Sequence, residues 1–115
     1  LLYAMTIRYK SETFDLTTTD KTTILTCPAD ATIIVKSLQA NHKTASNVDV
    51  DAFLQKSGGS DVEISHSQLN KNFTNLVLSS LNMEASDVLK IQAASANTIT
   101  GAVSYALIDR SQENG

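Results

Sequence analysis

The chain is divided by turn signals into short β-forming segments at intervals of about ten residues, and this spacing most constrains its fold. The clearest case is residues 47–55, where apolar and polar residues alternate strictly. A period of two is typical of a strand with one buried face. The glycine pair in residues 57–60 predicts a hairpin, because glycine accepts the positive φ of primed turns. Residues 61–65 are expected to return as the partner strand, with Val62 and Ile64 pointing inward.

Other segments with alternating or continuous apolar residues are also expected to be strands. The unbroken run Ile33-Ile34-Val35 predicts a strand that is covered on both faces or bends between sheets. Residues 82–87 fit either one helical turn or a tight loop, with Ser86 and Asp87 as turn formers. The further strands are expected at residues 2–9, 13–16, 22–27, 32–42, 75–81, 88–94 and 98–108.

Composition supports an all-β fold, because thirteen threonines, with their branched Cβ, suit a pleated surface. We predict an antiparallel β-sandwich of jelly-roll or immunoglobulin-like Greek-key type with about eight short strands. A length of 115 residues is that of one domain. We expect residues 1–16 to be an N-terminal strand or assembly arm, residues 17–108 to be the sandwich, and residues 109–115 to be an exposed polar tail. The chain does not begin with Met, so we expect something upstream of Leu1.

Charge and cysteine content exclude several classes of function. The formal net charge is −3 and the nine lysines and arginines are scattered, so no basic stripe is expected to bind nucleic acid. No apolar run approaches the roughly 20 residues that span a membrane. The single cysteine, Cys27, excludes an intrachain disulfide and fits synthesis in a reducing cytoplasm. It is expected to be a small buried hydrophobic residue.

No group of residues predicts catalysis. Asp49, Asp51 and Asp61 belong to one expected hairpin and offer oxygen ligands for calcium, but a solvated strand face explains them better. His42 and His66 have no partner at helical spacing and are expected at the surface or a strand edge. We therefore expect no catalytic, cofactor-binding or metal-binding residues, no cofactor and no enzymatic activity.

The first sixteen residues are too apolar for an idle tail. Their apolar side chains, together with Phe53 on an otherwise polar strand face, form the expected assembly interface. The alternative is that this segment supplies the first strand pair of the sandwich. The interface residues are Leu2, Tyr3, Met5, Ile7, Tyr9, Phe14, Leu16 and Phe53.

Two segments resemble a family of small structural proteins of tailed bacteriophages, over roughly residues 22–107 and including the Gly58-Gly59 hairpin. Each combines a small turn with an apolar strand. Where family members often carry Gly after the proline, this chain has Ala29-Asp30-Ala31. The first segment contains Cys27-Pro28-Ala29-Asp30-Ala31-Thr32, Ile34-Val35-Lys36-Ser37-Leu38 and Ala40-Asn41, and the second contains Leu81, Met83-Glu84-Ala85-Ser86-Asp87, Leu89, Ile91 and Ala93.

This resemblance implies a non-enzymatic virion protein that assembles in many copies, as a capsid decoration or cement protein or as a neck or tail component. Its implied partners are other copies of itself and the major capsid, neck or tail proteins, with neither nucleic acid nor membrane. A carbohydrate- or receptor-binding module of a phage fibre is the alternative, with Phe53 as the aromatic platform for a sugar.

Overall fold

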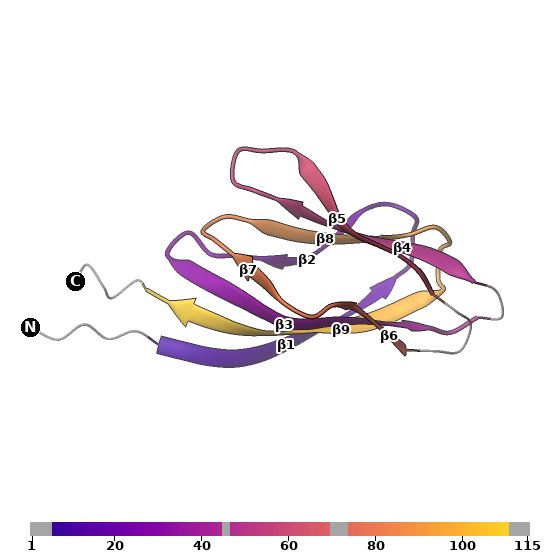
Figure 1. Cartoon of the computed structure of the whole chain (residues 1–115), viewed down its shortest axis with the longest axis horizontal. Helices are drawn as coiled ribbons and strands as arrows, with labels where there is room; N and C mark the ends of the chain where they lie inside the picture. Colours follow the sequence, from indigo (N-terminus) through magenta and orange to yellow (C-terminus); the bar gives the residue numbers. More distant parts are fainter. Residues whose placement is uncertain (1–5, 45–46, 70–73, 111–115) are drawn as a thin grey trace, which may run out of the picture.

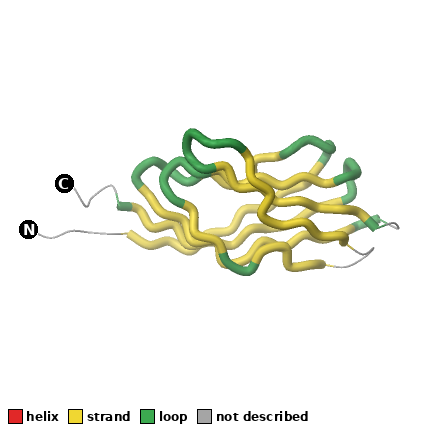
Figure 2. Tube along the Cα trace, turned by 45° about the horizontal axis from the view of Figure 1, so that its top comes forward, coloured by secondary structure: helices red, strands yellow, loops and turns green. Residues whose placement is uncertain are grey.

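The computed structural model describes residues 6–44, 47–69 and 74–110, which form nine strands and no helix (Figures 1 and 2). Within these residues there is accordingly no helix of the length and apolar character needed to cross a membrane. The strands are β1 (Thr6–Leu16), β2 (Thr22–Thr26), β3 (Ala31–His42), β4 (Val48–Gln55), β5 (Asp61–Leu69), β6 (Thr74–Leu78), β7 (Leu81–Met83), β8 (Val88–Ala93) and β9 (Ile99–Asp109).

The strands build two antiparallel sheets that pack face to face as a β-sandwich, as the sequence predicts (Figure 1). The five-stranded sheet has the order β1-β9-β3-β6, with β7 also paired to β3, and the four-stranded sheet has the order β2-β8-β4-β5. When β6 and β7 are counted as one interrupted strand, this order is that of an eight-stranded jelly roll. The jelly-roll alternative is therefore the one this chain adopts.

The core lies between the sheets and consists of the alternate residues of the central strands. In β3, Ile33, Val35 and Leu38 are buried, and in β9, Ile99 and Val103 are buried. Burying one such aliphatic side chain contributes about 1.5–3 kcal/mol, so the strands are held chiefly by their inward faces. Ile34, between two buried neighbours, remains partly exposed, so the apolar run in β3 is not covered on both faces.

The N-terminal segment forms one strand rather than two. β1 pairs with β9 from Thr6 opposite Asp109 to Leu16 opposite Ile99, so the break expected between residues 9 and 13 is absent. Leu81–Met83 pairs with β3 as strand β7, so Asn82 and Met83 belong to a strand and not to the expected helical turn or loop. The turn after it is formed as predicted, with Ser86 at a φ of 68°.

The hairpin between β4 and β5 differs from the expected primed turn. The Gly59 N–H donates to the Lys56 carbonyl oxygen at 2.8 Å, and only Gly58, third in this four-residue turn, has a positive φ. A positive φ at the third position is typical of a type II turn, whereas primed turns require one at the second position. Val62 is 59% exposed and not inward as expected, whereas Ile64 is partly buried against the core.

Cys27 is buried, as predicted. Its thiol lies 3.3 Å from the Ala31 carbonyl oxygen, and burial raises the pKa of this thiol. A thiol with a raised pKa is a poor nucleophile at neutral pH. His42 is also buried, which contradicts its expected surface position. Its Nδ1 accepts a hydrogen bond from the Thr44 N–H at 3.1 Å, so this histidine stabilises the end of β3.

Candidate assembly surface

The outer face of the five-stranded sheet carries a group of apolar side chains, which we call the apolar strip: Ile7, Tyr9, Ile34, Ala106 and Ile108. Tyr9 is opposite Ala106, which is opposite Ile34 on its other side, and Ile7 is opposite Ile108. Residues directly opposite one another in an antiparallel pair share a face. The next residues along, Val35 and Tyr105, are buried in the core, so the strip faces outward.

The apolar strip has three exposed large side chains, whereas its small residue Ala106 is only 7% exposed. Tyr9 is 75% and Ile7 is 51% exposed, and Ile34 is also accessible. Leu76 of β6, opposite Gln39, adds a further exposed apolar side chain to the same sheet. Of the five large hydrophobic residues that are exposed within residues 6–44, 47–69 and 74–110, four thus lie on this sheet. Clustering of this kind distinguishes an interaction surface from scattered exposed residues.

A hollow of about 370 Å³ adjoins the strip where β3 bulges. The extra residue of this bulge, Lys36, places its ammonium group 4.9 Å from the centre of the Tyr9 ring. A cation at this distance from an aromatic ring is attracted to its face. The hollow is lined by Tyr9, Lys10, Ser11, Lys36, Ser104 and Tyr105.

β1 is the edge of this sheet and, among the described strands, pairs only with β9 (Figure 1). Arg8, Lys10 and Glu12 occupy the alternate positions of β1 that share the inward face with Tyr105. Charged residues at such positions protect an edge strand from unselective pairing with other strands. The exposed face of the sheet, not its edge, is therefore the better candidate for a specific contact.

The predicted interface residues fall into different environments. Ile7 and Tyr9 lie in the apolar strip. Leu16 is buried in the core, and Phe14 is partly buried opposite Gly101, where the absence of a Cβ makes room for its ring. These two side chains stabilise the chain's own fold, because the inward face of β1 is covered by the core at this end of the strand. Leu2, Tyr3 and Met5 lie outside the described residues.

Phe53 lies on the other sheet and is only 9% exposed. The Lys21 ammonium group covers its ring at 4.2 Å from the centre. Asp61 accepts hydrogen bonds from Lys90 and Lys21 at 2.9 and 3.2 Å, and these bonds hold the pKa of its carboxyl below the ordinary value. Asp61 is thus neutralised by lysines and does not join Asp49 and Asp51 in the calcium site considered from the sequence.

Sequence reasoning missed Ile34, Ala106, Ile108 and Leu76 as parts of this surface. One signal was present in the sequence, because Ile34 and Ile108 interrupt an alternation in which their positions should be polar. The local pattern could not tell whether these side chains are covered by another layer or left exposed. That distinction depends on the arrangement of the sheets.

No protein-family model matches this chain, and no curated protein matches it. Several solved structures share its fold at low sequence identity. A chain of the Helicobacter pylori bacteriophage KHP30 capsid is 10% identical, with a TM-score of 0.59 and coverage of 96% of this chain and 92% of that one. A chain of the Bacillus endospore appendages, described as disulfide-linked pili, is 10% identical, with a TM-score of 0.57 and coverage of 95% and 90%. A chain from the virus-like particle of the giant freshwater prawn extra small virus is 12% identical, with a TM-score of 0.51 and coverage of 97% and 84%.

Proposed function

We propose that this protein is a non-enzymatic structural subunit of a viral particle that assembles in many copies. The observation that carries the proposal is the apolar strip on the outer face of a jelly-roll sheet. The KHP30 capsid and the prawn virus-like particle, which contain the same fold, support it. The fold also occurs in the Bacillus pili, so assembly into repetitive structures is the property that the three similar structures have in common.

Within this class we propose a virion protein of a tailed bacteriophage, as a capsid decoration or cement protein or as a neck or tail component. The sequence resemblance over residues 22–107 supports this narrower assignment. Contact through the strip would remove Ile7, Tyr9 and Ile34 from water, at about 25 cal/mol for each Å² of apolar surface buried. The partner is another copy of this chain or a second virion protein.

The proposal is tested by charge substitutions in the apolar strip. Ile7→Lys combined with Ile34→Lys is expected to weaken self-association or capsid binding at least about tenfold, because two ammonium groups would have to be desolvated in the contact. Sedimentation velocity and electron microscopy of assembled particles measure the effect. Substitution is preferred to deletion of residues 1–16, because the deletion would remove β1 and take Leu16 out of the core.

Val62→Lys is the matched control for this test, because Val62 is equally exposed but lies on the four-stranded sheet. It is expected to leave association unchanged. Normal assembly of the double variant, or an equal loss of assembly with Val62→Lys, would show that the strip is not the contact surface.

The alternative, a carbohydrate- or receptor-binding module, now depends on Tyr9. Phe53 is only 9% exposed and is covered by Lys21, whereas Tyr9 is 75% exposed beside the hollow, with Lys36 over one side of its ring. Aromatic rings with a free face can stack on the apolar face of a sugar. If this alternative holds, Tyr9→Ala abolishes binding on a glycan array and leaves particle assembly intact, whereas the structural proposal predicts no glycan bound by either protein.

A further inference from the structure

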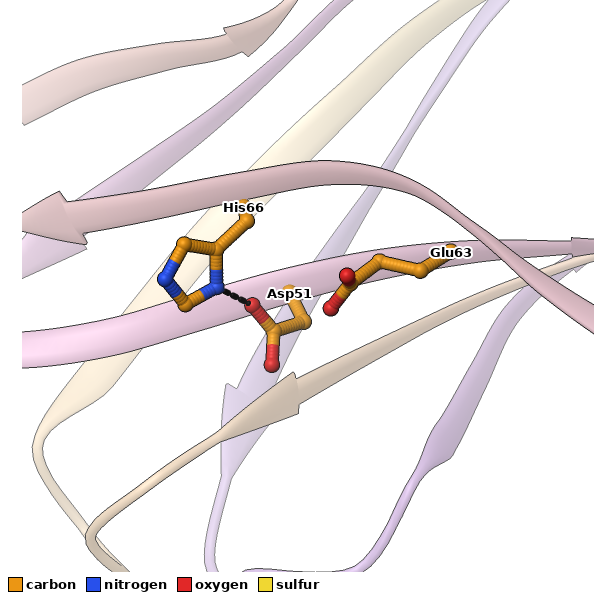
Figure 3. A group of neighbouring side chains, drawn as sticks. All are labelled: Asp51, Glu63 and His66. Carbon is orange, nitrogen blue, oxygen red and sulfur yellow. Dashed lines mark hydrogen bonds and ion pairs between the residues drawn. The ribbon is translucent and has the colours of Figure 1, made fainter.

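We propose that Asp51, Glu63 and His66 form a surface site for a divalent transition-metal cation such as Zn²⁺ (Figure 3). Each residue offers one ligand atom, and these atoms all lie within 4.8 Å of one another. Figure 3 shows the His66 ring and the Glu63 carboxylate turned toward Asp51 from either side. The sequence did not predict this site, because neither histidine has a second metal-ligating residue at helical spacing.

The pairing of β4 with β5 brings these residues together. Asp51 is directly opposite His66, so their side chains share a face. Glu63 lies three residues before His66, and in a regular strand an odd separation would place it on the opposite face. Between Ala52 and Phe53 the register shifts, so that Phe53 is opposite Glu63 and Ala52 is opposite Ser65. This bulge leaves Ile64 as the extra residue and turns Glu63 to the face of Asp51.

The charges around the site favour a cation. Among the described residues, the one ion pair of Asp51 is with Nδ1 of His66, and no lysine or arginine neutralises Glu63. Asp61, on the same strand, differs because it is paired with both Lys21 and Lys90. The Asp49 carboxylate also acts electrostatically on His66. Bulges often re-aim a side chain next to a functional site, and this one concentrates negative charge around a single imidazole.

The donor set indicates which cation is expected. One imidazole nitrogen and two carboxylate oxygens are ligands of zinc and related transition metals, whereas calcium takes oxygen ligands alone. Three protein ligands leave positions for water or for a group from another molecule. The site lies on the four-stranded sheet and the apolar strip on the other, so metal binding can be tested separately from assembly.

The test uses the full chain, treated with a chelator and then titrated with Zn²⁺ alone at about pH 8, because the hydrogen bond to Asp51 raises the pKa of His66 and the ring must lose its proton to bind a metal. Isothermal titration is expected to give one equivalent of bound zinc. His66→Asn and Glu63→Gln are each expected to weaken binding by about tenfold or more. Asp20→Asn, which removes the same charge from an exposed loop, should leave the affinity unchanged. Calcium in place of zinc should bind far more weakly.

Proton NMR locates the metal, because the chain has only two histidines and one of them, His42, is buried. Zinc is expected to shift the ring resonances of His66 and to leave those of His42 in place. Full zinc affinity in both His66→Asn and Glu63→Gln would overturn the proposal. So would a wild-type protein that binds no more zinc than a variant carrying both of these substitutions. Neither result would bear on assembly through the apolar strip.

Discussion

Asp87→Ala is expected to lower the free energy of unfolding by about 3 kcal/mol at pH 7, although this residue is not part of the assembly surface. Asp87 precedes β8 and its side chain is 1% exposed. The carboxylate accepts a hydrogen bond from the Lys56 ammonium group at 2.5 Å and from the Glu84 and Ser57 backbone N–H groups at 2.9 and 3.3 Å. Removing it leaves the two backbone N–H groups without their acceptor and leaves Lys56 with the Glu84 carboxylate at 3.6 Å.

The position of Asp87 explains why one side chain matters so much. Its hydrogen bonds join the β7–β8 turn to the β4–β5 hairpin. Its backbone carbonyl oxygen accepts from the Cys27 N–H at 2.9 Å, which ties the same turn to the end of β2. Asp87 therefore holds together three parts of the chain: the β7–β8 turn, the β4–β5 hairpin and the end of β2.

Stability should also depend on pH through Asp87. Burial by itself raises the pKa of this carboxyl, but the hydrogen bonds from Lys56, Glu84 and Ser57 outweigh burial and hold the pKa below its ordinary value of 3.8. A carboxyl whose pKa is lower in the folded state stabilises the fold above its unfolded pKa and loses this contribution as the pH falls through the folded value. The wild-type protein is therefore expected to lose stability below about pH 4.

Urea denaturation between about pH 2.5 and 7 measures both effects. Asp87→Asn is expected to be less stable at pH 7 and to show a shallower loss in acid. Some acid dependence should remain, because the lysines that contact Asp61 also lower the pKa of that carboxyl. Asp20→Asn provides the charge-matched control and should resemble the wild type. If Asp87→Asn had the stability and pH profile of the wild type, Asp87 would not be the residue that fixes these connections.

Gly101→Ala is expected to lower the free energy of unfolding by about 2 kcal/mol, and Gly101→Val by more. Gly101 lies in β9 between Phe14 of β1 and Ala40 of β3. An added Cβ would come within 3.0 Å of the Phe14 ring and of the Gln39 carbonyl oxygen. The carbonyl belongs to a paired strand in the centre of the sheet, so it cannot move without disturbing the ladder.

Equilibrium unfolding of Gly101→Ala, Phe14→Ala and the double variant measures this packing as a double-mutant cycle. The glycine substitution should cost less in the Phe14→Ala background, because one of the two crowded contacts is then removed. Gly59→Ala is the control, since the nearest atom to its Cβ would be the Lys56 carbonyl oxygen, at 3.3 Å, in an exposed hairpin. A neutral effect of Gly101→Ala, or strictly additive costs, would contradict the proposed packing of Phe14 on Gly101.

The sequence by itself determined where the strands lie, because alternation and turn residues are local properties. The predicted segments at residues 22–27, 32–42 and 98–108 agree with β2, β3 and β9 to within one residue at each end. The inward side chains of β9, such as Val103 and Tyr105, were also predictable, since a strand buried on one face must alternate. Of the four interface residues predicted within β1, Ile7 and Tyr9 are exposed, whereas Phe14 is partly buried and Leu16 is buried.

Only the tertiary structure decided which faces are covered. Tyr9, Ala106 and Ile34 come from three strands that are distant in the chain and become one surface through the order β1-β9-β3. The pattern of β4 placed Phe53 on the outer face correctly but could not show that Lys21 covers it. The bulge opposite β4 moved Glu63 to the face of His66, because one extra residue reverses the alternation that follows it. Sequence periodicity specifies two faces for each strand, and only the packing of the sheets specifies which of them meets water.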